Sequence, residues 1–234
     1  MPPGKSGKHA RIENMGYNFL NNMTLGDLLY LKNHKSIIVV GAFILLLTLS
    51  ITFISVFWPK YEERFFEFGL LGKDATAEAY YPNDNSTLNV DSNINWHIYL
   101  YNHMGSPQNV IVRVKLLNST LQLPDNQQHT PSPLESFAEF PLFISVDDTT
   151  LVPFSWSISE VVVQNGSTIL KTLTVNNEKM MVDVSSTSNS FFHMVFELWV
   201  YDQSSQKYSF EWENGKDIFS ASLQMAFKLT SSVG

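Results

Sequence analysis

An uncharged apolar run between Lys35 and Lys60, SIIVVGAFILLLTLSITFISVFWP, constrains this chain more than any other feature. As a helix, the part from Ile37 to Trp58 would be about 33 Å long, enough to cross the hydrocarbon core of a bilayer. The alternative is a cleaved signal peptide, but the preceding segment is long, and bulky residues follow where a cleavage site needs small ones. The sequence therefore predicts an uncleaved transmembrane helix over residues 36–59.

The residues around this run fit the two membrane interfaces. We expect Trp58 and Tyr61 in the aromatic belt at one end of the helix and Lys35 at the interface of the other end. Residues 1–35 are predicted to form a flexible tail followed by a short juxtamembrane helix, because Thr24 resembles a weak helix cap. Of two interpretations, an N-terminal extension of the transmembrane helix is favoured over a separate helix that lies against the membrane surface.

The distribution of charge predicts the orientation in the membrane. Residues 1–36 contain five lysines and arginines against two acidic residues, a net charge of +3. The whole chain carries −7, so the rest of the chain carries −10. The positive-inside rule then places the N-terminus in the cytoplasm and the larger C-terminal part outside. We expect a single-pass protein of the cell membrane, with the lipid bilayer as its first partner.

Composition and missing motifs exclude several kinds of chemistry. The chain has no cysteine, so disulfides, thiolate chemistry and cupredoxin-type copper are excluded. Its acidity argues against a nucleic-acid partner, which requires a basic surface. There is no G-x-S-x-G, H-E-x-x-H, phosphate loop or glycine-rich dinucleotide turn. We therefore predict no cofactor and no catalytic residues.

After Tyr61 the apolar residues follow a period of two instead of the helical period. Ile94, Trp96, Ile98 and Leu100 alternate with polar or amphipathic residues, and alternation of this kind is typical of half-buried strands. Similar segments occupy residues 110–116, 140–146, 152–158, 192–200 and 219–229, with shorter candidates at 65–71, 78–81, 87–90, 169–175, 180–184 and 207–212. Turn signals separate the segments, and residues 124–133 form the one long loop. The pattern predicts an all-β fold in which residues 62–232 form one antiparallel immunoglobulin-like β-sandwich.

His97 and His103 raise the question of a metal site. If neighbouring strands pair with Trp96 opposite Val114, His97 faces Arg113, and that cation disfavours a bound metal ion. Along a straight strand the two histidines lie about 20 Å apart, too far to share an ion. We therefore predict one histidine on a solvated sheet face and the other in a loop.

Other charged residues in the strands are also predicted to lie at the surface. His193 and Glu197 would be neighbours on a helix, but the residues around them favour a strand, which separates them by about 13 Å. Glu67 is predicted either at a sheet edge or in a pair with Arg64.

Aromatic side chains supply a candidate interaction face, since 13% of the residues are aromatic. We select Tyr99, Tyr101, Trp199 and Tyr201 as a face for an envelope or membrane-complex protein. The alternative is that these rings are covered within the sandwich or lie against lipid headgroups. Three sequons in the predicted external part, at Asn85, Asn118 and Asn165, are candidate glycosylation sites, although a chain of this composition has about three by chance.

The beginning of the predicted external domain contains the stretch RFFEFGLLGKDATAEAYYPN, followed by a strand and then YNHMG. Glu67, Gly72, the Tyr81-Pro82 pair and the Asn102-His103 step are the positions that carry a likeness. Over about residues 61–117 the chain resembles an uncharacterised, mainly archaeal membrane-anchored family, the domain of unknown function numbered sixteen-sixteen. The resemblance implies an archaeal cell-envelope setting and a sandwich, and it implies no activity.

We therefore predict a membrane-anchored envelope protein whose β-sandwich is a noncatalytic protein-interaction or accessory-subunit module. The alternative is an envelope hydrolase or metal-dependent enzyme that uses loop residues such as Asp147, Asp148, His129 and Glu160. For the two adjacent aspartates, a turn is favoured over a catalytic role.

Overall fold

The computed structural model describes residues 25–57, 64–187, 190–214 and 217–230. The chain divides into two compact units, residues 1–61 and 62–234, which are described separately. Trp58, Tyr61 and Thr24 lie outside the described residues.

The first unit contains one long helix, α2 (Leu25–Phe57). The helix is continuous through Lys35, so from Leu25 onward the segment before the membrane span extends the same helix, as the favoured interpretation has it, and a separate juxtamembrane helix is not formed there. The part from Ile37 to Ser55 is long and apolar enough to cross a membrane, and it is the one such helix among the described residues. Its hydroxyl groups donate to carbonyls of the preceding turn, as Thr52 does to Thr48 (2.8 Å), which leaves little unsatisfied polarity on an exposed apolar helix.

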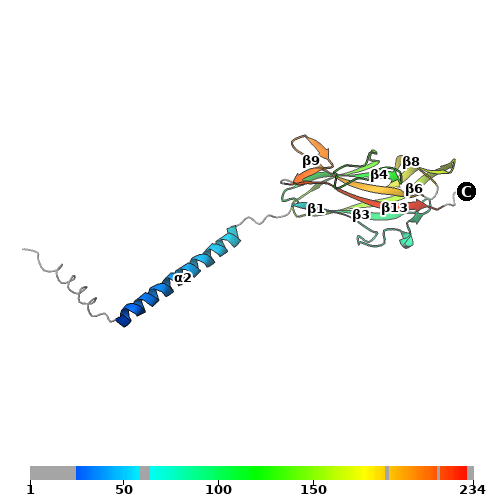
Figure 1. Cartoon of the computed structure of the whole chain (residues 1–234). Coiled ribbons are helices and arrows are strands. Elements are labelled where there is room, and N and C mark those ends of the chain that lie inside the picture. Colours follow the sequence, from blue (N-terminus) through cyan, green and yellow to red (C-terminus); the bar gives the residue numbers. More distant parts are fainter. Residues whose placement is uncertain (1–24, 58–63, 188–189, 215–216, 231–234) are drawn as a thin grey trace, which may run out of the picture. The chain divides into compact units, whose positions relative to one another are not determined.

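The second unit consists of two packed sheets and a small hairpin (Figure 1). The first sheet has the order β1 (Phe65–Leu71), β3 (Ile94–His103), β6 (Thr149–Gln164), β7 (Ser167–Val175) and β8 (Glu178–Thr187). The second has the order β2 (Thr87–Leu88), β13 (Ala221–Leu229), β9 (Phe192–Asp202), β4 (Gln108–Asn118) and β5 (Ala138–Ile144), with β10 (Lys207–Ser209) beside β9. The hairpin is formed by β11 (Trp212–Asn214) and β12 (Asp217–Phe219), and a short 3₁₀ helix spans Pro82–Asp84.

The strand order is immunoglobulin-like, which confirms the predicted fold class. Strands β1, β3 and β6 occupy the positions of A, B and E in an immunoglobulin domain, and β13, β9, β4 and β5 occupy those of G, F, C and C′. The β7–β8 hairpin extends the first sheet beyond β6. Among the described strands, all pairings are antiparallel except the short one between β2 and β13.

Aromatic rings from both sheets meet in the core. Phe196 of β9 contacts Phe154 of β6 with ring centroids 5.2 Å apart and Trp96 of β3 at 6.1 Å. Trp156 of β6 contacts Phe227 of β13 at 5.1 Å. The predicted alternation on β3 is confirmed, because Trp96 and its inward neighbours are at most 2% exposed. Offset and edge-to-face contacts of this kind add stability beyond burial alone.

The predicted pairing of β3 with β4 is wrong, because the two strands belong to different sheets. His97 lies opposite Leu71 and Pro153, and its Nδ1 is 3.1 Å from the carbonyl oxygen of Gly72. Arg113 lies opposite Glu139 and Glu197. The chain crosses from one sheet to the other after His103, so the local hairpin that would have joined them does not form.

Asn102 holds this crossing in place. Its side chain is completely buried, and its Nδ2 lies within 3.1 Å of the carbonyl oxygens of Ser106, Ile144 and Ser145. Its Oδ1 accepts the backbone N–H of Met104 at 3.0 Å. The amide thus connects the end of β3 in one sheet to the end of β5 in the other.

The segment predicted as a strand at residues 78–81 is a loop folded back on Gly72. The loop passes so close to Gly72 that a Cβ added there would lie 1.8 Å from the carbonyl oxygen of Glu78. Position 72 therefore has no room for a side chain. The loop is anchored by Tyr80, whose hydroxyl donates to Leu70 (3.0 Å) and whose carbonyl accepts the Trp96 indole N–H.

Two sheet edges carry features that interrupt further pairing. On the edge strand β5, Pro141 removes a backbone N–H. On the edge strand β8, the register with β7 shifts between Leu170 and Thr172, and Asp183 adopts a positive φ of 47°. Such a bulge twists an edge away from flat pairing.

Candidate interaction surface

A long loop, residues 119–137, covers half of the outer face of the second sheet and is called the covering loop below. The prediction of a long loop at 124–133 is thus confirmed and the loop is longer. Leu117 and Val195 point outward from β4 and β9, yet both are completely buried because the covering loop lies over them. The loop also reaches the beginning of β13, where His129 and Asn126 contact Ser220, just before the strand, and Asn126 contacts Ser222 within it.

A buried ion pair connects the covering loop to the sheet. Lys115 Nζ is 2.8 Å from Glu197 Oε2, with the two side chains 5% and 0% exposed. Glu197 also accepts the backbone N–H of Ser132 (2.7 Å) and the indole N–H of Trp199 (3.0 Å), while Lys115 donates to the carbonyl of Ser132 (2.9 Å). The two charged groups therefore hold the loop at Ser132 by two charge-assisted hydrogen bonds, one to its N–H and one from Lys115 to its carbonyl.

The prediction that His193 and Glu197 lie at the surface is wrong for Glu197, which is completely buried, whereas His193 is half-buried. Both point outward from β9, as the strand periodicity requires, but the covering loop forms a third layer over Glu197. His193 Nδ1 is buried without a hydrogen-bond partner, and burial lowers the pKa of the imidazole. The neutral form is therefore the one that the fold favours.

The uncovered half of the same face carries apolar and aromatic side chains, which we call the aromatic platform. Its members are Ile111, Pro141, Phe143, Trp199, Tyr201 and Tyr208. Ile111 lies between Pro141 and Trp199 in the register, and Tyr201 lies beside Tyr208 with ring centroids 5.3 Å apart. Phe143 is 66% exposed, which is unusual for a ring of that size at a sheet surface.

Charged groups fix the largest ring of the platform. The Arg113 guanidinium carbon lies 4.1 Å from the centre of the Trp199 ring, and Arg113 Nε is 2.9 Å from Glu139 Oε1. Trp199 also packs against Phe210, with ring centroids 5.9 Å apart, and its indole N–H donates to Glu197. A ring held on several sides loses little further entropy when it contacts a partner.

The four rings predicted as one interaction face lie on two opposite faces. Trp199 and Tyr201 belong to the aromatic platform, whereas Tyr99 and Tyr101 point outward from β3 in the other sheet. The single-face prediction is therefore wrong, because it treated β3 and β9 as parts of one surface when the fold places them in different layers.

Tyr99 and Tyr101 belong to a polar network on the outer face of the first sheet. Tyr99 donates to Glu67 (2.9 Å), which lies on the edge strand β1 as one alternative predicted. His103 Nδ1 lies 2.8 Å from Asp147 Oδ1, and Tyr101 stacks on the His103 ring. His103 is the last residue of β3, so the prediction that it lies in a loop is wrong.

The residues proposed for a catalytic alternative make separate contacts. His129 contacts Ser220, Glu160 accepts from Thr172 (3.1 Å), and Asp147 contacts His103. Asp147 and Asp148 form the predicted turn before β6. In the described part of the chain, no group of three or more histidine, cysteine, aspartate or glutamate side chains could hold a metal ion.

The three sequons differ in their surroundings. Asn85 is exposed before β2, and Asn165 is exposed in the tight turn between β6 and β7, with a φ of 51°. Asn118 is half-buried, donates to the Ser185 carbonyl (2.6 Å) and accepts from Thr120 and Leu121. A glycan therefore has more room at Asn85 and Asn165 than at Asn118.

The sequence contained an indication of the platform residues Pro141 and Phe143, which were not predicted. With Phe140 and Leu142 inward, Phe143 had to point outward, and an outward phenylalanine beside Pro141 is not explained by core packing. The residues around Lys115 gave a similar indication. Apolar residues follow it without interruption, and a strand that is covered on both faces loses the alternation of apolar and polar residues.

No family model matches the chain, and no curated protein matches it. Among solved structures, the CARDB domain of the PF1109 protein from Pyrococcus furiosus, in complex with di-metal ions, aligns with 73% of this chain and 96% of its own, at 7% identity and a TM-score of 0.34.

Two further alignments involve short parts of larger enzymes. A β-glucosidase from Listeria innocua in complex with gluconolactone aligns with 73% of this chain and 17% of its own, at 11% identity and a TM-score of 0.28. The alkylpurine DNA glycosylase AlkC from Pseudomonas fluorescens, bound to DNA containing an abasic site analog, aligns with 44% of this chain and 27% of its own, at 13% identity and a TM-score of 0.23. At such TM-scores none of the three says anything about function.

Proposed function

We propose that this protein is a single-pass membrane protein whose β-sandwich is a noncatalytic module that binds another protein of the cell envelope. The aromatic platform is the contact surface, and its uncovered position beside the covering loop is the observation that carries the proposal. The N-terminus is cytoplasmic and the sandwich is external, as the charge distribution indicates. The resemblance to the archaeal membrane-anchored family supports the same envelope setting.

The chemistry of the platform supports a protein partner. Tryptophan, tyrosine and arginine are the residues that most often dominate the energy of protein interfaces, and Trp199, Tyr201 and Arg113 lie together at its centre. Glu139 at the rim is 45% exposed and already paired with Arg113, so a partner does not have to organise this charge. A solvated face without a role would more often carry polar residues at these outward positions.

A photo-cross-linking experiment tests the platform. A photoreactive phenylalanine analogue replaces Phe143, and in a matched variant it replaces Leu151, which is 47% exposed on β6 in the other sheet. In membranes of the native host we expect one major protein adduct from position 143 and none of the same mass from position 151. In the position-143 chain, a Trp199→Ser substitution should weaken that adduct, since Trp199 is the anchored ring.

Identical adducts from both faces, or no protein adduct from position 143, would contradict the proposal. The orientation is tested separately by adding a protease to intact cells. Cleavage within the sandwich, with the N-terminal segment protected, is expected, and the reverse pattern would show that the sandwich is internal.

A further inference from the structure

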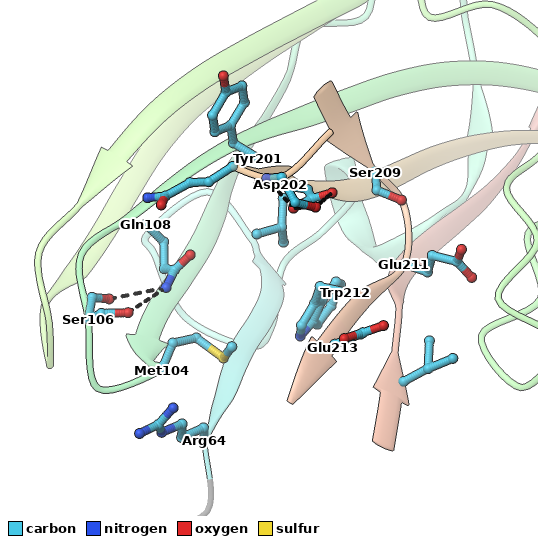
Figure 2. A pocket seen from close by; sticks show the side chains of 14 residues that line it. Arg64, Met104, Ser106, Gln108, Tyr201, Asp202, Ser209, Glu211, Trp212 and Glu213 are labelled. Carbon is cyan, nitrogen blue, oxygen red and sulfur yellow. Dashed lines mark hydrogen bonds between the residues drawn. The ribbon is translucent and has the colours of Figure 1, made fainter. Parts of the chain in front are cut away.

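A pocket of about 470 Å³ lies at one end of the sandwich (Figure 2). The turn between β3 and β4, the turn between β9 and β10, and the β11–β12 hairpin meet there. Tyr201 belongs both to this pocket and to the aromatic platform, so the two surfaces are continuous. The volume lies in the range of pockets that hold small molecules or single side chains.

The pocket has apolar groups at its inner side. Met104 and Val200 are only 8% and 6% exposed, and both line the pocket where the core ends. Trp212 supplies an aromatic wall, and Phe66 of β1 holds its ring from behind in an edge-to-face contact at 5.5 Å. The indole is therefore packed against β1, and it is partly exposed where it lines the pocket.

The charges around the pocket are mostly negative. Asp202, Glu211 and Glu213 contribute three carboxylates against the single guanidinium of Arg64, which has an interaction of its own. Hydrogen bonds from Ser205 and Ser204 lower the pKa of Asp202 to about 2, so this group is an anion at neutral pH. Within the described residues, Glu211 and Glu213 have no hydrogen bond or ion pair that would neutralise them.

We propose that this pocket binds a primary ammonium group on an aliphatic stem, as in the side chain of lysine. The methylene groups lie against Met104, Val200 and Trp212, and the ammonium group lies near the carboxylates at the rim. The face of an indole attracts a cation, and nearby carboxylates strengthen that attraction. Anionic ligands are disfavoured by the same charges. The inference does not require that the aromatic platform binds a protein.

The test uses the full-length chain in detergent micelles, labelled with 5-fluorotryptophan. The chain has five tryptophans, and a Trp212→Phe variant assigns the Trp212 signal in the fluorine NMR spectrum. The probe is Nα-acetyl-L-lysine methylamide, and the matched control is the norleucine analogue, which has the same stem without charge. We expect the lysine probe to shift the Trp212 signal in a saturable manner while the other signals stay unchanged, and the norleucine analogue to produce no saturable shift.

Substitutions then test the role of the carboxylates. The double variant Glu211→Gln/Glu213→Gln should bind the lysine probe about tenfold more weakly, because the ammonium group loses its interactions with two solvent-exposed carboxylates. Unchanged signals from the other tryptophans confirm that this variant is folded. Glu178→Gln, an exposed carboxylate on β8 outside the pocket, should bind as the parent does. Equal shifts with both probes, no shift with the lysine probe, or unchanged affinity in the double variant would each overturn the proposal.

Discussion

Breaking the buried ion pair between Lys115 and Glu197 is expected to destabilise the sandwich strongly. A Glu197→Gln substitution keeps an acceptor for the Ser132 N–H but leaves the Lys115 ammonium, in a side chain only 5% exposed, without its carboxylate. Removal of one partner from a buried pair costs about 3–5 kcal/mol. Since domains have about 5–15 kcal/mol of stability in total, this is a large part of it.

The exposed pair Arg113–Glu139 is a matched control. Its N···O distance of 2.9 Å is almost the same, but its side chains are 27% and 45% exposed. Solvent screens such a pair, so Glu139→Gln should cost less than about 1 kcal/mol. With a urea slope of about 2 kcal/mol/M, the buried substitution lowers the unfolding midpoint by about 2 M and the exposed one by less than about 0.5 M.

The measurement is urea unfolding of residues 62–234, followed by tryptophan fluorescence, for both single variants, for Lys115→Met and for Lys115→Met/Glu197→Gln. The double variant should be more stable than the sum of the two single effects predicts, because the unpaired charge is gone. Limited proteolysis should also cut the covering loop faster in Glu197→Gln. If Glu197→Gln costs no more than Glu139→Gln, the pair does not hold the loop and the reasoning is refuted.

Three further changes test other parts of the fold by the same unfolding measurement. Gly72→Ala should cost at least about 2 kcal/mol, because its methyl group overlaps the Glu78 carbonyl and the backbone must move; a neutral result would show that the loop is not packed there. Asn102→Ala should cost about 3 kcal/mol through buried carbonyls left without a donor, and a loss below about 1 kcal/mol would contradict its role as a link between the sheets. For His193, whose folded pKa lies below the unfolded value near 6.5, stability should fall as the pH drops below about 6.5, and His193→Gln should remove that part of the pH dependence.

The individual strands could be predicted from sequence because a pleated strand sends successive side chains to opposite faces. The run around Trp96 shows this clearly, since the predicted inward residues are the buried ones. Which strands become neighbours could not be predicted from periodicity. The pairing assumed between His97 and Arg113 failed because a period of two is the same whether the next strand lies in the same sheet or in the opposite one.

The candidate site was predicted only in part, for a related reason. Trp199 and Tyr201 were selected correctly as outward aromatic residues, but the period could not show that the covering loop hides Glu197 two residues before Trp199. That third layer depends on contacts between Ser132 and residues far along the chain. The pocket depends similarly on two turns and a hairpin that are separated in sequence and meet only after folding.

The interrupted edges of the two sheets have a consequence for the proposed membrane-anchored protein. Molecules tethered to a common plane meet one another far more often than molecules diluted in three dimensions. An edge strand with regular, unpaired backbone groups would then recruit identical neighbours into a growing ribbon. With no N–H at Pro141 and a positive φ at Asp183, the edges at β5 and β8 do not offer a regular template for such a ribbon.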